Sequence, residues 1–183
     1  MNSSGAQFML HKHFLKSDQV SALWGQLERL DWQQESFKIF GRRHLAPRKS
    51  CWFGDSGLNY RYAGSDHLAQ PWPTELQPLH AEVTRFCGCD FNYVLLNHYQ
   101  SGAEYMGWHK DDERGSAPHI AALSLGAERP FDLEVGDKWE RIILDSGSLL
   151  CFDGRIRHRL PKTMKVKQPR ISLTFRSILR HDA

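Results

Sequence analysis

The feature that most constrains this fold is a run of short strands, broken by turns, that begins near Phe91. Runs of four to ten residues separated by glycine-containing turns predict strands in these segments, and Gly136-Asp137 between two of them indicates a tight hairpin. Strands that fill the C-terminal two thirds of a chain are typical of a β-sandwich or jelly roll. The segments are FNYVLLNHY (91–99), HIAALSLG (119–126), PFDLEV (130–135), WERIILD (139–145), SLLCFDG (148–154) and RISLTFRSIL (170–179).

The N-terminal part of the chain predicts helices. Ser17-Asp18 can cap the first one, and a second one starts near Pro73-Thr74-Glu75 and stops at Gly88. We therefore expect an α+β fold, mostly β, with helices packed on one side of a jelly roll. It would form one domain, 1–183, with helices in about 1–90 and the jelly roll in about 91–180. Apolar residues at helical spacing mark the first helix: Val20, Leu23, Trp24, Leu27 and Leu30.

Composition excludes few classes of function. The chain has 24 Lys and Arg against 21 Asp and Glu, and this net charge of +3 permits a polyanionic partner without requiring one. Its four cysteines form no CxxC pair, which argues against a zinc site or a disulfide framework. No segment approaches the ~18 apolar residues of a membrane span, and the N-terminus lacks the apolar region of a signal peptide. We expect an intracellular monomer, cytoplasmic or, in a eukaryote, nuclear.

A candidate metal site starts at His109-Lys110-Asp111. In an extended chain residues i and i+2 face the same way, so His109 and Asp111 can bind one ion together. His158 follows a later strand and would complete two imidazoles and one carboxylate, which leave octahedral positions open for a bidentate co-substrate and O2 on Fe(II). A chain with ten histidines contains about one His-x-Asp by chance. For this motif alone, a surface pair that only hydrogen-bonds is therefore the alternative.

The last strand adds a candidate anion site. Alternation along residues 170–176 places Arg170, Ser172, Thr174 and Arg176 on one face and apolar residues on the other. Burying a face with arginine at both ends is costly without an anionic partner. A dicarboxylate is such a partner, because guanidinium binds carboxylate through two hydrogen bonds.

The order of these motifs resembles the AlkB family of Fe(II)/2-oxoglutarate dioxygenases, and within it the AlkB homologue 2 type that repairs double-stranded DNA. The resemblance covers roughly residues 38–180. The segments that carry it are Asn97-x-Tyr99, His109-x-Asp111, His158, Arg170 to Arg176, Pro47-Arg48-Lys49, Gly54-Asp55-x-Gly57-Leu58-x-Tyr60, Pro71-Trp72, Phe91-Asn92 and Asp111-Asp112-Glu113.

The resemblance implies a double-stranded β-helix, which is a jelly roll, with an N-terminal nucleotide-recognition lid. It implies Fe(II) on His109, Asp111 and His158, which are also the catalytic residues, with O2 as the oxidant. Arg170 would bind the distal carboxylate of 2-oxoglutarate, and Arg176 the end that chelates iron. The full set of residues implied for 2-oxoglutarate is Asn97, Tyr99, Arg170, Thr174 and Arg176.

The implied substrate is alkylated DNA, single- or double-stranded, from which an N-alkyl group of the 1-methyladenine or 3-methylcytosine type is removed as formaldehyde. The base would leave the stack and enter a pocket. Phe40, flanked by basic residues, would fill the gap that it leaves. Asp112 and Glu113, which follow the metal ligand Asp111, would accept hydrogen bonds from an exocyclic amine of the base. The alternative for these two acidic residues is that they only face solvent. The residues implied for substrate binding are Phe40, Gly41, Arg42, Tyr60, Arg61, Tyr62, Asp112 and Glu113.

Two alternatives stay open. The same chemistry could act on RNA or on a protein side chain, although aromatic residues such as Tyr60 and Tyr62 favour bases. A nucleic-acid-binding module could also have kept the fold without catalysis, but the complete ligand set argues against this. The duplex-repair type carries a long basic loop where this sequence has only the turn at Gly136-Asp137, which leaves duplex preference open.

Overall fold

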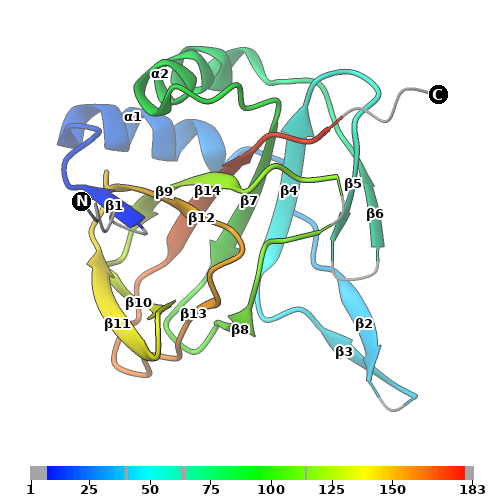
Figure 1. Ribbon diagram of the computed structural model, residues 1–183, viewed down its shortest axis with the longest axis vertical. Coiled ribbons are helices and arrows are strands. Elements are labelled where there is room, and N and C mark those ends of the chain that lie inside the picture. The colour runs from blue at the N-terminus through cyan, green and yellow to red at the C-terminus, as the bar shows by residue number, and fades with distance from the viewer. Residues whose placement is uncertain (1–7, 40, 63–64, 114, 180–183) are drawn as a thin grey trace, which may run out of the picture.

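The structure is a computed structural model that describes residues 8–39, 41–62, 65–113 and 115–179. Two antiparallel sheets face each other, and two helices cover the outer side of the larger one (Figure 1). This mostly β architecture agrees with the jelly roll expected from the strand pattern. No helix in the described part of the chain is long and apolar enough to cross a membrane.

The larger sheet has six strands in the order β1-β12-β9-β14-β7-β4, and the smaller has four in the order β11-β10-β13-β8. The larger sheet contains β1 (Phe8–His11), β4 (Lys49–Gly54), β7 (Tyr93–Tyr99), β9 (His119–Gly126), β12 (Leu149–Asp153) and β14 (Arg170–Arg176). The smaller contains β8 (Met106–His109), β10 (Arg129–Val135), β11 (Lys138–Leu144) and β13 (His158–Leu160). Two of these strands, β1 and β4, come from the part of the chain in which we expected helices and a lid.

The two helices lie where the sequence places them. Helix α1 (Ser17–Leu27) lies in the expected segment, but its N-cap is Lys16, so the cap predicted at Ser17-Asp18 is wrong by one residue. Leu30, expected on the apolar face of α1, lies beyond the end of the helix. The backbone N–H of Leu30 donates to the carbonyl of Leu27, three residues back, as the chain leaves the helix. A 3-10 turn, η1 (Thr74–Leu76), leads into α2 (Gln77–Cys87), and Gly88 ends α2 in the left-handed conformation with φ +61°.

Two hairpins stand apart from the sheets, on the right of Figure 1. One pairs β2 (Ser36–Ile39) with β3 (Arg42–Leu45), and the other pairs β5 (Asn59–Tyr62) with β6 (Ser65–Leu68). Gly41, at the turn of the first hairpin, has φ +76°, which glycine adopts without strain. Phe40 lies outside the described residues, as do the side chains of Tyr60, Arg61 and Tyr62.

Strand β14 divides the protein into two packed regions. Ile171, Leu173 and Phe175 face the helices and join the core that includes Leu27 and Val83. The polar face of β14 points between the sheets, toward a second apolar cluster that includes Leu133 and Leu150. The alternation predicted for residues 170–176 is confirmed, and the polar face lines the space where a site can form.

Candidate active site

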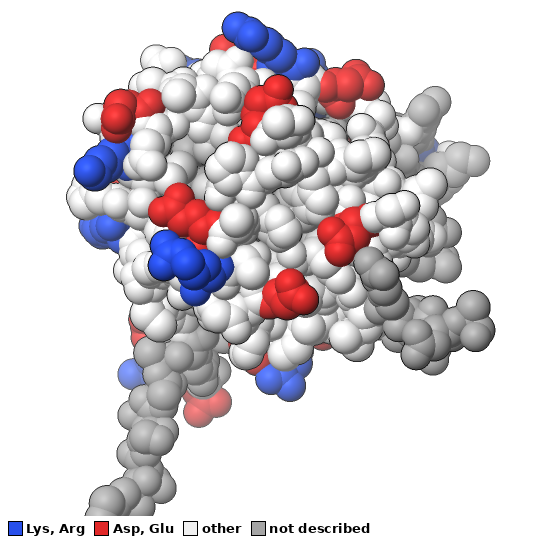
Figure 2. Space-filling model, turned by 90° about the horizontal axis from the view of Figure 1, so that it is seen from above, with Lys and Arg blue, Asp and Glu red and all other residues white. Residues whose placement is uncertain are grey.

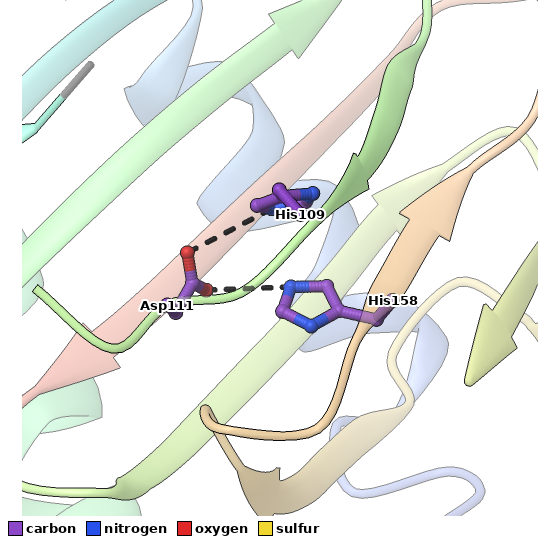
Figure 3. Close-up of side chains that lie close together, drawn as sticks. All are labelled: His109, Asp111 and His158. Atoms are coloured by element: carbon purple, nitrogen blue, oxygen red, sulfur yellow. Dashed lines mark ion pairs between the residues drawn. The ribbon is translucent and has the colours of Figure 1, made fainter. Parts of the chain in front are cut away.

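Three ligand-type side chains meet between the sheets. His109 ends β8, Asp111 follows it two residues later, and His158 begins β13, where it pairs in register with His109 (Figure 3). The ligand atoms of the three residues lie within 4.8 Å of one another. Strand pairing thus brings together residues that are far apart in sequence, and the predicted triad is confirmed.

Backbone carbonyls fix how both imidazoles face Asp111. Nδ1 of His109 lies 2.8 Å from the carbonyl of Gly107, and Nδ1 of His158 lies 2.8 Å from that of Ile156. A carbonyl only accepts hydrogen bonds, so each Nδ1 carries the proton and each Nε2 presents a lone pair. The two Nε2 atoms lie 3.7 and 3.4 Å from the oxygens of Asp111.

This donor set fits a divalent cation. Imidazole lone pairs and carboxylate oxygens point at one another, an arrangement that is unfavourable until a cation lies between them. Oδ1 of Asp111 is buried and has no hydrogen-bond partner in the described part of the chain. Two imidazoles and one carboxylate suit Fe(II) with positions left open. When bound there, iron would take Nε2 of His109, Nε2 of His158 and the Asp111 carboxylate.

Arg176 connects the triad to the polar face of β14. Its Nη2 lies 2.8 Å from Oδ2 of Asp111, and both side chains are buried. Burial acts to raise the pKa of Asp111, but the guanidinium of Arg176 outweighs it and holds that pKa below its ordinary range. Asp111 is therefore a carboxylate near neutral pH, ready to bind a cation.

Arg170 lies at the other end of the same face. It is buried, and its Nη2 donates to Oγ of Ser124 at 2.9 Å. Its Nε has no hydrogen-bond partner, and no carboxylate lies within ion-pair distance of it, among the residues that the structure describes. Burial lowers the pKa of Arg170 to about 10. A buried guanidinium without a carboxylate is costly, so the site is suited to an anion.

The remaining residues implied for 2-oxoglutarate lie in the same cleft. Tyr99 lies against Arg170, with the guanidinium carbon 5.6 Å from the ring centre, and Thr174 lies between the two arginines. Oδ1 of Asn97 accepts bonds from Nε of Arg48 at 2.8 Å and from Oγ of Ser50 at 3.1 Å. The amide NH2 group of Asn97 is thereby turned toward the cleft, which Asn97 lines.

The residues implied for substrate binding are less gathered. Asp112 is exposed and Glu113 half-buried, and neither lines the cleft around the triad. Gly41 and Arg42 are exposed on the β2–β3 hairpin. Side-chain positions are not described for Phe40, Tyr60, Arg61 and Tyr62. Among the side chains that the structure describes, the metal and anion sites are thus assembled, and none of those implied for substrate binding lines their cleft.

Sequence reasoning missed two side chains that orient this site. Arg48 lies in a segment that resembles the family, but its bond to Asn97 joins the residue before β4 to β7, across 49 residues of sequence. Ser124 pairs directly with Ser172 in register, and its hydroxyl holds Arg170. A serine within the apolar strand 119–126 was a signal for the second of these.

Comparison with known proteins agrees with this geometry. The family model for the 2OG-Fe(II) oxygenase superfamily matches residues 7–176. Human DNA oxidative demethylase ALKBH2 is 37% identical over 158 residues, which cover 78% of this chain and 60% of the relative. The chain belongs to the AlkB family of these oxygenases. Its cofactors are accordingly Fe(II) and 2-oxoglutarate, and His109, Asp111 and His158 form its facial triad.

Other relatives of this AlkB-family chain extend the comparison. ALKBH2 of Arabidopsis thaliana is 30% identical over 96% of this chain and 67% of its own length. Human alkB homolog 3, an alpha-ketoglutarate-dependent dioxygenase, is 35% identical over 80% of this chain and 57% of its own length. The chain thus spans about 60% of the length of the human relatives that it matches.

Solved structures with low sequence identity share the fold. A 2OG-Fe(II) oxygenase family oxidoreductase from Burkholderia pseudomallei has a TM-score of 0.65 and 12% identity, and covers 97% of this chain and 87% of its own. The structure of OsALKBH1 has a TM-score of 0.60 and 20% identity, and covers 96% of this chain and 100% of its own. At such identities the likeness shows the fold alone.

The metal ligands yield a first prediction. Asp111→Asn keeps the size of the side chain but removes its charge, so the affinity for Fe(II) or Co(II), titrated without oxygen, should fall by more than about 100-fold. Asp112→Asn is the matched control, because Asp112 is exposed and does not line the cleft, and its affinity should stay near wild type. Equal affinity in Asp111→Asn and the control would remove Asp111 from the ligand set.

A second prediction concerns acid stability. Burial, and next the neighbouring His158, lower the pKa of His109 from 6.5 to about 4. As the pH falls, the unfolded chain takes up this proton first, so the metal-free protein should lose stability between about pH 6.5 and pH 4. Asp111, whose pKa is lowered in the fold, contributes stability that is lost only at lower pH. Melting temperatures from pH 7.5 to 4.5 should therefore fall less steeply in His109→Gln than in wild type, and identical slopes would contradict the assignment.

Proposed function

We propose that this AlkB-family oxygenase removes N-alkyl groups from DNA bases of the 1-methyladenine and 3-methylcytosine type. The observation that carries the proposal is the 37% identity to the DNA oxidative demethylase ALKBH2, with the facial triad complete. When bound, iron with 2-oxoglutarate supplies oxidation of the N-alkyl carbon by O2, with succinate and CO2 as co-products. The hydroxyalkyl base then releases formaldehyde and the repaired base.

The polar face of β14 would hold 2-oxoglutarate. Arg170 would bind its distal carboxylate, since Arg170 is a buried guanidinium without a carboxylate partner among the described residues. Arg176 would serve the end near iron, since it already contacts Asp111. Asn97, Tyr99 and Thr174 would complete the contacts from the same cleft. The co-substrate would then lie along β14, with its distal carboxylate at Arg170 and its other end at the metal.

The two hairpins on the right of Figure 1 would form the nucleotide-recognition lid. Phe40 and Gly41 lie between β2 and β3, with Arg42 exposed beside them, so Phe40 would enter the base stack while Arg42 contacts a phosphate. Tyr60, Arg61 and Tyr62, on β5, would contact the flipped base. Asp112 and Glu113 would accept hydrogen bonds from an exocyclic amine, since both directly follow the metal ligand Asp111.

The distribution of surface charge favours binding of nucleic acid on a side of the molecule other than the one formed by the helices. On the face seen from above in Figure 1, where α1 and α2 lie, the Lys and Arg side chains of the described residues are scattered among acidic ones and form no basic patch (Figure 2). A phosphate backbone binds most tightly where Lys and Arg side chains are clustered. The hairpins and the smaller sheet, on other sides of the molecule, are therefore the better candidates.

One assay tests this function against its alternatives. The protein is incubated with Fe(II), 2-oxoglutarate and ascorbate, and formaldehyde and succinate are measured with single-stranded DNA, duplex DNA and RNA of one sequence carrying one 3-methylcytosine. Formaldehyde should form in step with succinate on DNA. Release from RNA alone would replace the proposed substrate. Succinate without formaldehyde on any strand would point to another substrate, and neither product would point to a binding module.

A third prediction tests the co-substrate site. Arg170→Gln removes a charge-assisted bidentate contact of about 2 kcal/mol or more, so the KM for 2-oxoglutarate should rise roughly 30-fold or further. Arg170→Lys keeps the charge but not the planar guanidinium, so its KM for 2-oxoglutarate should lie between those of Arg170→Gln and wild type. The affinity for Co(II) should be preserved in both variants, because Arg170 does not touch the triad. An unchanged KM in Arg170→Gln would make Arg170 a structural residue.

A further inference from the structure

The outer face of the smaller sheet carries a row of alternating arginine and tryptophan side chains, here called the Arg–Trp row. It consists of Trp108 on β8, Arg157 and Arg159 on or beside β13, and Trp139 and Arg141 on β11. Guanidinium carbons lie over the indole rings, with Arg159 at 4.7 Å from the Trp108 ring centre and 6.0 Å from that of Trp139. Arg157 lies 5.5 Å from the Trp108 ring centre, and Arg141 lies 5.2 Å from that of Trp139.

Acidic residues on the central strand β10 hold these arginines in place. Asp132, fully buried, accepts bonds from Nε and Nη2 of Arg141 at 2.6 and 3.0 Å and from Nε of Arg159 at 2.7 Å. Glu134 accepts from Nη1 of Arg157 at 2.8 Å. One buried carboxylate thus serves two guanidiniums, and the row has a net positive charge. The side chains are preorganised, so little entropy is lost when they bind a ligand.

The Arg–Trp row lies directly behind the facial triad. Successive side chains of a strand point to opposite faces, so His109 faces the cleft while Trp108 faces outward. His158 likewise points inward between Arg157 and Arg159. Strand β8 is an edge of the sheet, and the His109 side chain on it is 25% exposed. The row therefore starts beside the open side of the metal site and crosses four strands, roughly 15 Å at ~4.8 Å per strand.

The exposure of Trp139 is unusual for an indole side chain. Trp139 is 52% exposed, and the side chains of Arg141 and Arg157 are each 46% exposed. Indole rings in water favour a partner with flat apolar faces, and fixed guanidiniums favour phosphate. A nucleic-acid strand alternates flat bases with phosphates, and these match the alternating indoles and guanidiniums of the row. The tight turn between β10 and β11, at Gly136-Asp137, leaves this face uncovered by any loop of that hairpin.

We propose that the Arg–Trp row binds the part of the substrate strand that flanks the alkylated base. Bases would stack on Trp139 and on the Trp108 edge, and the arginines would contact the phosphates between them. At about 3.4 Å per stacked nucleotide, the row spans about four nucleotides. The inference rests on the proposed function for its ligand, and it adds a surface that selects long single strands over short ones.

The test compares two substrates that carry one 3-methylcytosine, a 15-nucleotide single strand and a trinucleotide too short to reach Trp139 from the metal site. Trp139→Ala should raise the KM for the 15-mer at least about five-fold, because stacking one base is worth ~1–3 kcal/mol. With the trinucleotide its KM should stay within about two-fold of wild type. Met9→Ala, 56% exposed on the edge strand of the other sheet, is the control and should change neither KM.

Arginine variants give an independent measurement. Arg157→Gln and Arg155→Gln each remove an exposed arginine that is paired with one carboxylate, Glu134 and Asp153 respectively, but only Arg157 belongs to the row. Binding of an unmodified, fluorescently labelled 15-mer is followed by anisotropy as salt rises. Arg157→Gln should weaken binding and lower the salt dependence by about one released counterion, and Arg155→Gln should do neither.

The outcomes separate this inference from the proposed function. If wild type releases no formaldehyde from either substrate, the proposed function fails, while the anisotropy measurement with the unmodified strand still decides whether the row binds it. If wild type is active and both Trp139→Ala and Arg157→Gln match their controls on the 15-mer, the row is a structural packing of the sheet and the inference is wrong.

Discussion

The interaction on which the site depends is the buried contact between Asp111 and Arg176. Two opposite charges removed from water are stable only if their geometry is good and their remaining polar atoms find partners. Arg176 supplies one partner to the carboxylate, and the two imidazoles approach it from the smaller sheet. The pair therefore ties the loop after β8 to the end of β14, and it fixes the distance between the two sheets at the point where iron would bind.

Strand β14 shows how one alternating sequence serves two purposes. Its apolar side chains complete the core beneath the helices, and its polar side chains line the cleft. A shift of the register by one residue would exchange the two faces, and would bury Arg170 and Arg176 against the helices. Pairing with β7 and β9 on both sides excludes that shift over nearly the whole strand. The stability of the core and the orientation of the co-substrate site are thus set by the same register.

Much of this organisation could be predicted from local sequence. Alternation in residues 170–176 gave the faces of β14 correctly, and the spacing of His109 and Asp111 gave two ligands on one side of an extended chain. The sequence did not reveal that β1 and β4 belong to the larger sheet, since both pair with strands that are distant in the sequence. The same limit applies to the bond of Arg48 to Asn97 and to that of Arg159 to Asp132, because both join residues that only long-range strand pairing brings together.

The hydrogen bonds from the imidazoles to backbone carbonyls have a consequence for how the protein acquires its metal. Gly107 and Ile156 belong to the chain on either side of the pairing between β8 and β13, so the orientation of each ring is set by the sheet rather than by the ion. Loss of the ion would leave the ligands in place, since no local refolding is needed to present them again. Binding of the metal would then require no change in the strands that carry the two imidazoles.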